Sequence, residues 1–317
     1  MKLRQMARDL MRARGNPKKK KGTTPIPSIS RVAPVEFYLA VVSMVKNEGE
    51  ILKEWITFHR LVGCDHIFLY DNGSSDNTAD VLRPFVAEGF VTLMPWPEFF
   101  PWGSRAGIDS REAAFAHSIC SFGARCRWMM FIDVDEFVFP AYANDLKQPL
   151  SAYEDLPAIA LPWHMFGHSG HMSKPGGLVT ESYTMRASLP VVEPLLAKYK
   201  SVADPVRIRI ARHHRFIVDE GRVTYTQGRK VLKDPDWGFL EPDSADPIIL
   251  NHYYTRSVEQ FERKILRPSA SAVSRADKRI LRRDAIESSA VEDLRIQRFV
   301  PALRDAMLCA WDARGQP

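Results

Sequence analysis

Long apolar segments are missing from this sequence of 317 residues. No apolar run reaches the roughly 18 residues that a helix needs to cross a membrane. The first 22 residues also lack the apolar core of a secretory signal peptide. Cysteine is scarce: four are spread along the chain, and none forms a Cys-x-x-Cys pair. From these absences we expect a cytoplasmic protein with free thiols.

Basic charge is concentrated at the N-terminus, although the whole chain has a net charge of +6. Residues 1–22 carry nine Lys or Arg and one Asp, which gives +8. The other residues carry 35 basic and 37 acidic side chains, which gives −2. The body of the protein therefore lacks the excess of basic residues that nucleic-acid binding requires, and we expect no nucleic-acid partner.

Residues 1–34 are interpreted as an N-terminal tail. Apolar residues recur at helical spacing from Leu3 to Met11 with basic residues between them, a pattern typical of a short basic amphipathic helix. The run Lys18–Lys21 and the prolines after it indicate a linker. Two interpretations stay open: a solubilising disordered arm, or a segment for peripheral contact with an anionic membrane.

Apolar runs alternate with amphipathic segments between residues 37 and 132. The runs predict buried strands at 37–42, 66–70, 91–94 and 128–132. The amphipathic segments predict helices at 50–62, 77–87 and 105–122. Such alternation is typical of an α/β fold in which helices cover both faces of a parallel sheet. Ligands of such sheets bind at the carboxyl ends of the strands.

The pattern is weaker after Pro140. Shorter strands are predicted at 159–163, 178–185, 206–210 and 248–250, and the segment 257–311 is mostly helical. We interpret this half as elements that complete the same domain and cover one side of it.

Two carboxylates follow the fourth predicted strand directly. Asp133 and Asp135 are separated by one residue and flanked by apolar residues on both sides. Acids between core residues need a reason to be there, because burying a charge is costly. Placed at a strand end, the two carboxylates can bind Mg²⁺ or Mn²⁺ through oxygen. Such an ion neutralises a diphosphate and makes it a better leaving group.

Six segments carry a resemblance to a known family. They are Val42–Glu48, Tyr70–Thr78, Phe131–Phe137, Trp163–Gly170, Lys198–Val202 and Asn251–Ser257, the last followed by Phe261 and Lys264. Together they resemble glycosyltransferases of family 2 and, more narrowly, of family 92 (DUF23-like). The resemblance implies a GT-A fold, with a Rossmann-like, mostly parallel sheet, over residues 35–267. Residues 268–317 would then be a helical C-terminal extension.

The resemblance also implies roles for individual residues. The donor-binding residues would be Asn47, Glu48, Asp71, Asp133 and Lys200. The metal ligands would be Asp133, Asp135 and His252. For His252 an alternative stays open, a histidine hydrogen-bonded within an aromatic core beside Tyr253 and Tyr254. The chain departs from the family pattern at Arg111, where we expect Gln.

Inverting transfer of a sugar needs a general base for the acceptor hydroxyl. Glu181, Asp204 and Asp219 are the candidates, and we select Glu181 because it follows the His- and Gly-rich segment that is suited to an acceptor wall. Histidines gather in the same region without the spacing of a zinc site: His164, His168, His171, His213 and His214. The tryptophans that are candidates for stacking on sugar rings are Trp96, Trp102 and Trp163.

The predicted activity is metal-dependent, inverting transfer of a sugar from a nucleotide diphosphate sugar, with a UDP-sugar as the expected donor. The acceptor would be a glycan or another hydroxyl compound. One alternative is a degenerate transferase that binds the donor without turnover. Another is an aspartyl phosphohydrolase with Asp133 as nucleophile, which would need Thr or Val at the position of Phe137.

Overall fold

The computed structural model describes residues 24–97, 110–191, 193–212, 216–218, 224–232, 239–266 and 272–312. The predicted amphipathic segment of the tail lies outside these ranges. No helix within them is long and apolar enough to span a bilayer.

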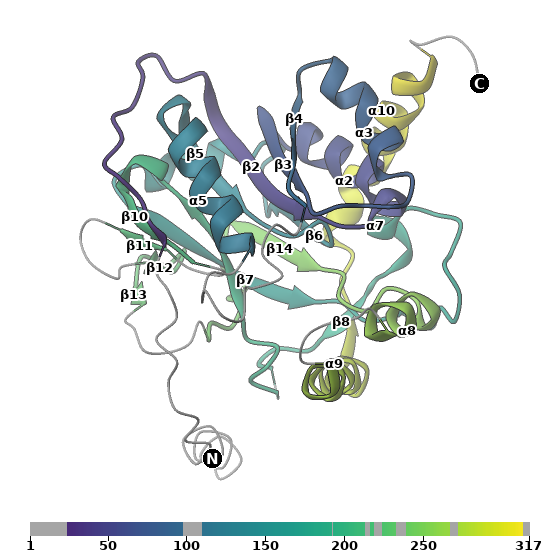
Figure 1. The fold of residues 1–317 in the computed structure, drawn as a ribbon. Coiled ribbons are helices and arrows are strands. Elements are labelled where there is room, and N and C mark those ends of the chain that lie inside the picture. Colours follow the sequence, from purple (N-terminus) through teal and green to yellow (C-terminus); the bar gives the residue numbers. More distant parts are fainter. Residues whose placement is uncertain are drawn as a thin grey trace.

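Four parallel strands form the first half of the central sheet (Figure 1). They are β2 (Phe37–Val45), β3 (His66–Asp71), β4 (Val91–Pro95) and β5 (Cys126–Phe131), in the spatial order β5-β2-β3-β4. All four coincide with strands predicted from apolar runs. Their carboxyl ends lie at one edge of the sheet, where polar residues follow β2 at 46–48 and acidic residues follow β5 at 133–136.

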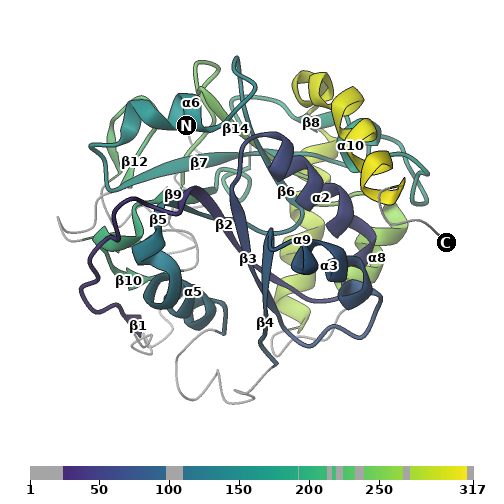
Figure 2. The same ribbon diagram turned by 90° about the horizontal axis from the view of Figure 1, so that it is seen from above.

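Helices cover both faces of this sheet, as predicted. Along β2, Leu39 and Val41 pack into one core with α2 (Gly49–Leu61) and α3 (Thr78–Ala87). Ala40 and Val42 point the other way, into a second core with α5 (Ser110–Phe122). This alternation is the period of two that a strand imposes on its side chains. Figure 2 shows α5 on one side of these strands and α2 and α3 on the other.

The second half of the sheet joins parallel and antiparallel strands. β9 (Tyr199–Ala203) lies antiparallel between β5 and β7 (Ala158–Met165). β14 (Ile248–His252) is parallel to β7 and antiparallel to β6 (Glu136–Pro140). In this register His252 is the partner of Glu136, and Tyr253 N donates to the Asp135 carbonyl at 2.9 Å. Residues more than a hundred positions apart in the sequence therefore meet beside the loop of residues 132–135 between β5 and β6, which we call the acidic loop.

Smaller elements surround the main sheet. The outer strands are β12 (Thr224–Tyr225) and β13 (Val231–Leu232); a separate small sheet holds β1 (Thr24–Pro25), β10 (Ile208–Ala211) and β11 (Ile217–Val218); and β8 (Met185–Ala187) pairs with β15 (Ala290–Glu292). The remaining helices are α6 (Lys147–Leu150), α7 (Val179–Ser182), α8 (Val258–Leu266), α9 (Ala272–Glu287) and α10 (Val300–Asp312). The C-terminal part is mostly helical, as expected, and it also contributes β15.

The strand predicted at 178–185 is wrong. Half of this segment is the short helix α7 (Val179–Ser182). The Glu54 carboxylate of α2 caps this helix by accepting hydrogen bonds from Val179 N at 2.8 Å and Thr180 N at 2.9 Å. A contact that spans about 125 positions of sequence decides the local structure here. The strand predicted at 206–210 begins later, at Ile208, because residues 205–207 form a 3-10 turn whose first amide is capped by Asp204.

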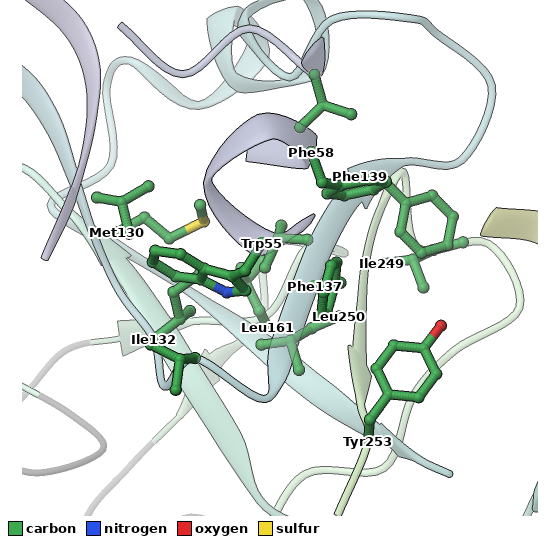
Figure 3. Close-up of a cluster of buried hydrophobic side chains, with 14 of the residues drawn as sticks. Trp55, Phe58, Met130, Ile132, Phe137, Phe139, Leu161, Ile249, Leu250 and Tyr253 are labelled. Carbon is green, nitrogen blue, oxygen red and sulfur yellow. The ribbon is translucent and has the colours of Figure 1, made fainter. Parts of the chain in front are cut away.

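The larger core connects α2 to the strands that carry the acidic loop. Trp55 of α2 is fully buried, and its Nε1 donates a hydrogen bond to the Glu136 carbonyl at 2.7 Å. Figure 3 shows Trp55 within this cluster, with Met130 and Ile132 on one side and Phe137 on the other. The indole therefore anchors the backbone directly after Asp133 and Asp135.

We expect Trp55→Phe to lower the free energy of unfolding by about 2–4 kcal/mol, because it opens a cavity and leaves the buried Glu136 carbonyl without its donor. Urea unfolding measures this loss. The control is Val86→Ala on α3, where the side chain is 39% exposed and the expected loss is below about 1 kcal/mol. Equal losses in the two variants would contradict the anchoring role.

Candidate active site

The acidic loop follows β5 and turns back on itself before β6. Glu136 N donates to the Asp133 carbonyl at 3.1 Å, and Asp133 N donates to Glu136 Oε2 at 2.7 Å. Because of this turn, side chains of α5 and β9 contact the Asp133 carboxylate, whereas side chains of α8 and β14 contact that of Asp135. The turn lies at the carboxyl end of a parallel strand, where ligands bind in sheets of this kind.

Asp133 is held by two cations. Its Oδ1 accepts a hydrogen bond from Arg111 Nη1 of α5, and its Oδ2 accepts one from Lys200 Nζ of β9, each at 2.6 Å. Burial by itself raises the pKa of Asp133, but the charges of Arg111 and Lys200 outweigh burial and hold this pKa far below its ordinary value. Asp133 is therefore ionised at neutral pH.

Asp135 lies between a lysine and a histidine. Lys264 Nζ of α8 donates to Oδ2 at 2.9 Å, and His252 Nε2 of β14 is 3.5 Å from Oδ1. Burial raises the pKa of Asp135, yet the charge of Lys264 outweighs it and keeps this pKa well below the ordinary value. Burial lowers the pKa of His252 and outweighs the nearby carboxylate, so the imidazole is neutral at pH 7.

Glu136 lies beneath the two aspartates with no exposed surface. Its Oε2 is 3.4 Å from Lys200 Nζ, and its Oε1 is 3.8 Å from His252 Nδ1. Burial raises the pKa of Glu136 to about 8, against the opposing charge of Lys200. Lys200 and His252 therefore each contact Glu136 and one of the aspartates.

The ends of β2 and β3 are joined by a hydrogen-bonded chain. Asn47 has a φ of 56°, in the left-handed region that Asn tolerates better than most residues. Its Oδ1 accepts from Ser75 N at 2.7 Å, and its N donates to Ser74 Oγ at 3.0 Å. Asp71 Oδ1 in turn accepts from Ser74 Oγ at 2.7 Å and from Ser74 N at 2.9 Å. Asn47 and Asp71 are thus held close together at the sheet edge.

Glu48 connects this edge to the C-terminal half of the chain. Its Oε2 is 3.1 Å from Arg256 Nη2, and both side chains are largely buried. A cavity of about 350 Å³ opens beside this pair. Its lining residues come from three parts of the chain: Asn47, Glu48, Glu50, Asp76, Asn77, Arg256, Gln260 and Arg263. The predicted donor-binding residues Asn47 and Glu48 therefore border a cavity of a size that admits part of a ligand.

The two candidate bases that the structure describes, Glu181 and Asp204, do not join the acidic loop. Glu181 of α7 forms an ion pair with Arg304 of α10 at 2.5 Å. Asp204 is buried and pairs with Arg127 at 3.0 Å and with Arg31. Asp219, like Trp102, His213 and His214, lies outside the described residues.

The remaining candidates are histidines and tryptophans, and those that the structure describes contact different partners. His168 lies 3.4 Å from Glu287, and His171 Nε2 is 3.0 Å from the Ser182 carbonyl. His164 is buried, and burial lowers its pKa to about 3. Trp163 packs edge-on against His252 with 4.5 Å between ring centroids, and Trp96 packs against Tyr70. Of the two candidate tryptophans within the described ranges, Trp163 therefore contacts His252, a predicted metal ligand.

Within the described part of the chain, no three His, Cys, Asp or Glu side chains are gathered into a metal cage. Asp135 and His252 nevertheless present an oxygen and a neutral nitrogen to each other across 3.5 Å. Mg²⁺ in proteins is commonly bound by one or two carboxylates together with substrate phosphates, and such a site needs no complete protein cage.

Several contacts in the site were not predicted from the sequence. The structure adds Arg111, Glu136, Arg256 and Lys264 to the predicted residues. Glu136, Arg256 and Lys264 belong to segments used for the family resemblance, whereas Arg111 is the position at which the chain departs from the family pattern. No local pattern identifies which acid each of them contacts.

Comparison with known proteins identifies the relatives of this chain. A glycosyltransferase family 92 protein of Oryza sativa subsp. japonica is 29% identical over 265 residues, which cover 78% of this chain and 40% of that protein. Another of Arabidopsis thaliana is 30% identical over 227 residues, covering 63% of this chain and 37% of that protein. The chain thus spans about 40% of the length of the curated relatives that it matches.

Solved structures are less similar to this chain in sequence. Staphylococcus aureus TarS has 12% identity, covers 78% of this chain and 42% of its own, and gives a TM-score of 0.36. The glucosyl-3-phosphoglycerate synthase of Mycobacterium tuberculosis, solved with Mn²⁺ and UDP-glucose, has 21% identity, coverages of 40% and 44%, and a TM-score of 0.28. The assignment therefore rests on the family model. The model for glycosyltransferase family 92 matches residues 37–235, well over half of the sequence, and the chain belongs to this family.

Proposed function

We propose that this glycosyltransferase transfers a sugar from a nucleotide diphosphate sugar, with a UDP-sugar as the first donor to test, to a hydroxyl acceptor such as a glycan. The observation that carries the proposal is the acidic loop at the carboxyl end of β5. Its two ionised carboxylates are surrounded by Arg111, Lys200, Lys264 and His252. This arrangement suits a ligand that carries both an anionic diphosphate and a metal ion.

The donor would lie along the carboxyl ends of β2, β3 and β5. Glu48 and Asp71 would contact the nucleoside, with Asn47 beside them. This proposal is supported by the cavity that Asn47 and Glu48 border and by the hydrogen bonds through Ser74 that hold Asp71 near Asn47. Asp133 would approach the ribose. Lys200, which forms ion pairs with Asp133 and Glu136, would contribute a positive charge to the donor site.

Asp135 and His252 would hold a divalent ion, Mn²⁺ or Mg²⁺, and Asp133 would support it from the same loop. The fit rests on the neutral imidazole, which can act as a ligand, and on the 3.5 Å between its Nε2 and Asp135 Oδ1. When bound, such an ion neutralises charge on the diphosphate as it leaves. The protein's own cations would act in the same sense by attracting the diphosphate to the loop.

Inverting transfer needs a base, and Glu181 stays a prediction. To act as one, its carboxylate would have to leave Arg304. The hypothesis predicts that Glu181→Gln lowers kcat by about 100-fold or more while UDP binding stays unchanged. An unchanged kcat would leave Glu181 with a structural role alone.

We expect Asp135→Asn to abolish Mn²⁺-dependent turnover of a UDP-sugar, with a loss of about 100-fold or more, because the amide is a poor ligand and no longer pairs with Lys264. Thermal stabilisation by UDP with Mn²⁺ should disappear as well, since a ligand raises the melting temperature only when it binds the folded state. Asp80→Asn on α3 is the control, because its carboxylate is exposed and pairs with Arg83.

The same assay separates the competing functions. Turnover of the Asn variant at the rate of the unmodified protein would reject the metal assignment. A protein that is stabilised by UDP and Mn²⁺ without any turnover or hydrolysis would be a donor-binding relative without catalysis. Release of phosphate from simple phosphate esters would instead support the aspartyl phosphohydrolase.

The N-terminal tail would bring this enzyme to an anionic membrane surface from the cytoplasm. Each Lys or Arg near such a surface contributes about 1 kcal/mol of binding free energy. Replacing the four lysines Lys18–Lys21 by Gln should therefore weaken sedimentation with phosphatidylserine vesicles by at least about tenfold. Turnover with a soluble acceptor should not change. Equal vesicle binding by both proteins would favour the solubilising arm.

A further inference from the structure

Lys264 occupies the position beside Asp135 where a cation is needed. Its Nζ donates to Asp135 Oδ2 at 2.9 Å and to the Tyr254 carbonyl at 3.0 Å, and it lies 4.5 Å from the centroid of the Tyr254 ring. A carboxylate, a carbonyl oxygen and the face of an aromatic ring are the groups that attract an ammonium ion. The lysine is thus an internal counter-ion for Asp135.

A divalent ion cannot be added to this arrangement without competition. An ion bound through Asp135 Oδ2 would lie about 2.1 Å from that oxygen, and therefore at most about 5 Å from Lys264 Nζ, where the two positive charges repel each other. An ion bound through Oδ1 would share a carboxylate whose charge Lys264 already balances. In either case Lys264 weakens the attraction of Asp135 for metal.

We propose that Lys264 holds the cation position at Asp135 in the donor-free protein and moves to the nucleotide diphosphate when the donor binds, so that metal and nucleotide bind together. This inference rests on the proposed function of the site. It assigns Lys264 as a positioning residue that links the occupancy of Asp135 by metal to the arrival of the diphosphate.

The surroundings of Lys264 suit such an exchange. Its side chain keeps 20% of its surface exposed, whereas Lys200 keeps 1% and is held between Asp133 and Glu136. The backbone of Lys264 is fixed, because Arg279 of α9 donates to its carbonyl oxygen. A lysine combines a compact charge with a flexible four-carbon stem, so the ammonium can change partner while the helix stays in place.

The exchange also has a thermodynamic consequence. A ligand site that is open in a fraction of the molecules has an apparent affinity reduced by that fraction. While Lys264 pairs with Asp135, the metal site is blocked in most molecules, and the apparent affinity for free metal is low. A diphosphate that draws the ammonium away opens the site, and by reciprocity the metal strengthens nucleotide binding by the same factor.

The test measures binding of Mn²⁺ alone, and Mn²⁺ with UDP, from the electron paramagnetic resonance signal of the free ion. The proteins are the unmodified chain, Lys264→Met and Lys264→Gln, which both keep the length of the side chain approximately and remove the charge. Lys147→Met is the matched control, because Lys147 also pairs with an aspartate, Asp65, outside the site. All proteins are compared at the same UDP concentration, so that chelation of Mn²⁺ by UDP in solution cancels.

We expect both Lys264 variants to bind Mn²⁺ about tenfold more tightly than the unmodified chain when UDP is absent. The factor by which UDP improves Mn²⁺ binding should fall by about the same amount, and Lys147→Met should match the unmodified chain. Circular dichroism establishes whether each variant is folded. If Lys264→Met does not fold, the comparison is made with Lys264→Gln.

Two results would overturn the inference. The first leaves the proposed metal site at Asp135 intact, and the second rejects that site as well. If all proteins bind Mn²⁺ with UDP and the Lys264 variants bind free Mn²⁺ no more tightly than the control, the exchange is rejected and the metal site stands. If no protein binds Mn²⁺ under either condition, the proposed metal role of Asp135 is rejected together with the exchange.

Discussion

Compensation of buried carboxylates is the constraint on which the site depends. The loop after β5 places Asp133, Asp135 and Glu136 within four positions of the chain, in a region of low exposure. Ionised carboxylates in such a region are stable when cations and hydrogen-bond donors surround them. The cations come from α5, β9 and α8, and β14 adds a histidine. Removing one of them leaves a charge that the others cannot balance.

The fold places these partners because β5 and β6 lie on either side of the loop in one continuous sheet. β9 pairs with β5 and brings Lys200 under Asp133, while β14 pairs with β6 and brings His252 opposite Glu136. Trp55 holds the loop from the side of α2 through its bond to the Glu136 carbonyl. Sheet register therefore sets the geometry of the charges, and a shift of one residue would point each side chain to the opposite face.

The parallel half of the sheet could be predicted because its information is local. Each of the strands β2 to β5 is a short apolar run with a clear end, and Asp133 and Asp135 are recognisable as acids between core residues. The contacts of these acids could not be predicted in the same way. Arg111, Lys200 and Lys264 lie 22, 67 and 129 positions from their carboxylate partners, and such pairings follow from tertiary structure. The helix α7 was missed for the same reason, since its cap comes from Glu54.

Charge arithmetic explains why this site suits a donor and a metal together better than either alone. In the donor-free protein the three cations Arg111, Lys200 and Lys264 exceed the charge of the two ionised aspartates by one. Burial raises the pKa of Glu136 to about 8, so that Glu136 adds little negative charge at pH 7. Free metal would add positive charge where positive charge is already in excess, which Coulomb repulsion opposes. An anionic diphosphate without metal would add negative charge beside two ionised aspartates. A diphosphate that arrives with a divalent ion changes the local charge least, because the negative charge of the diphosphate offsets the positive charge of the ion. The cations of the protein offset the carboxylates of the acidic loop in the same way.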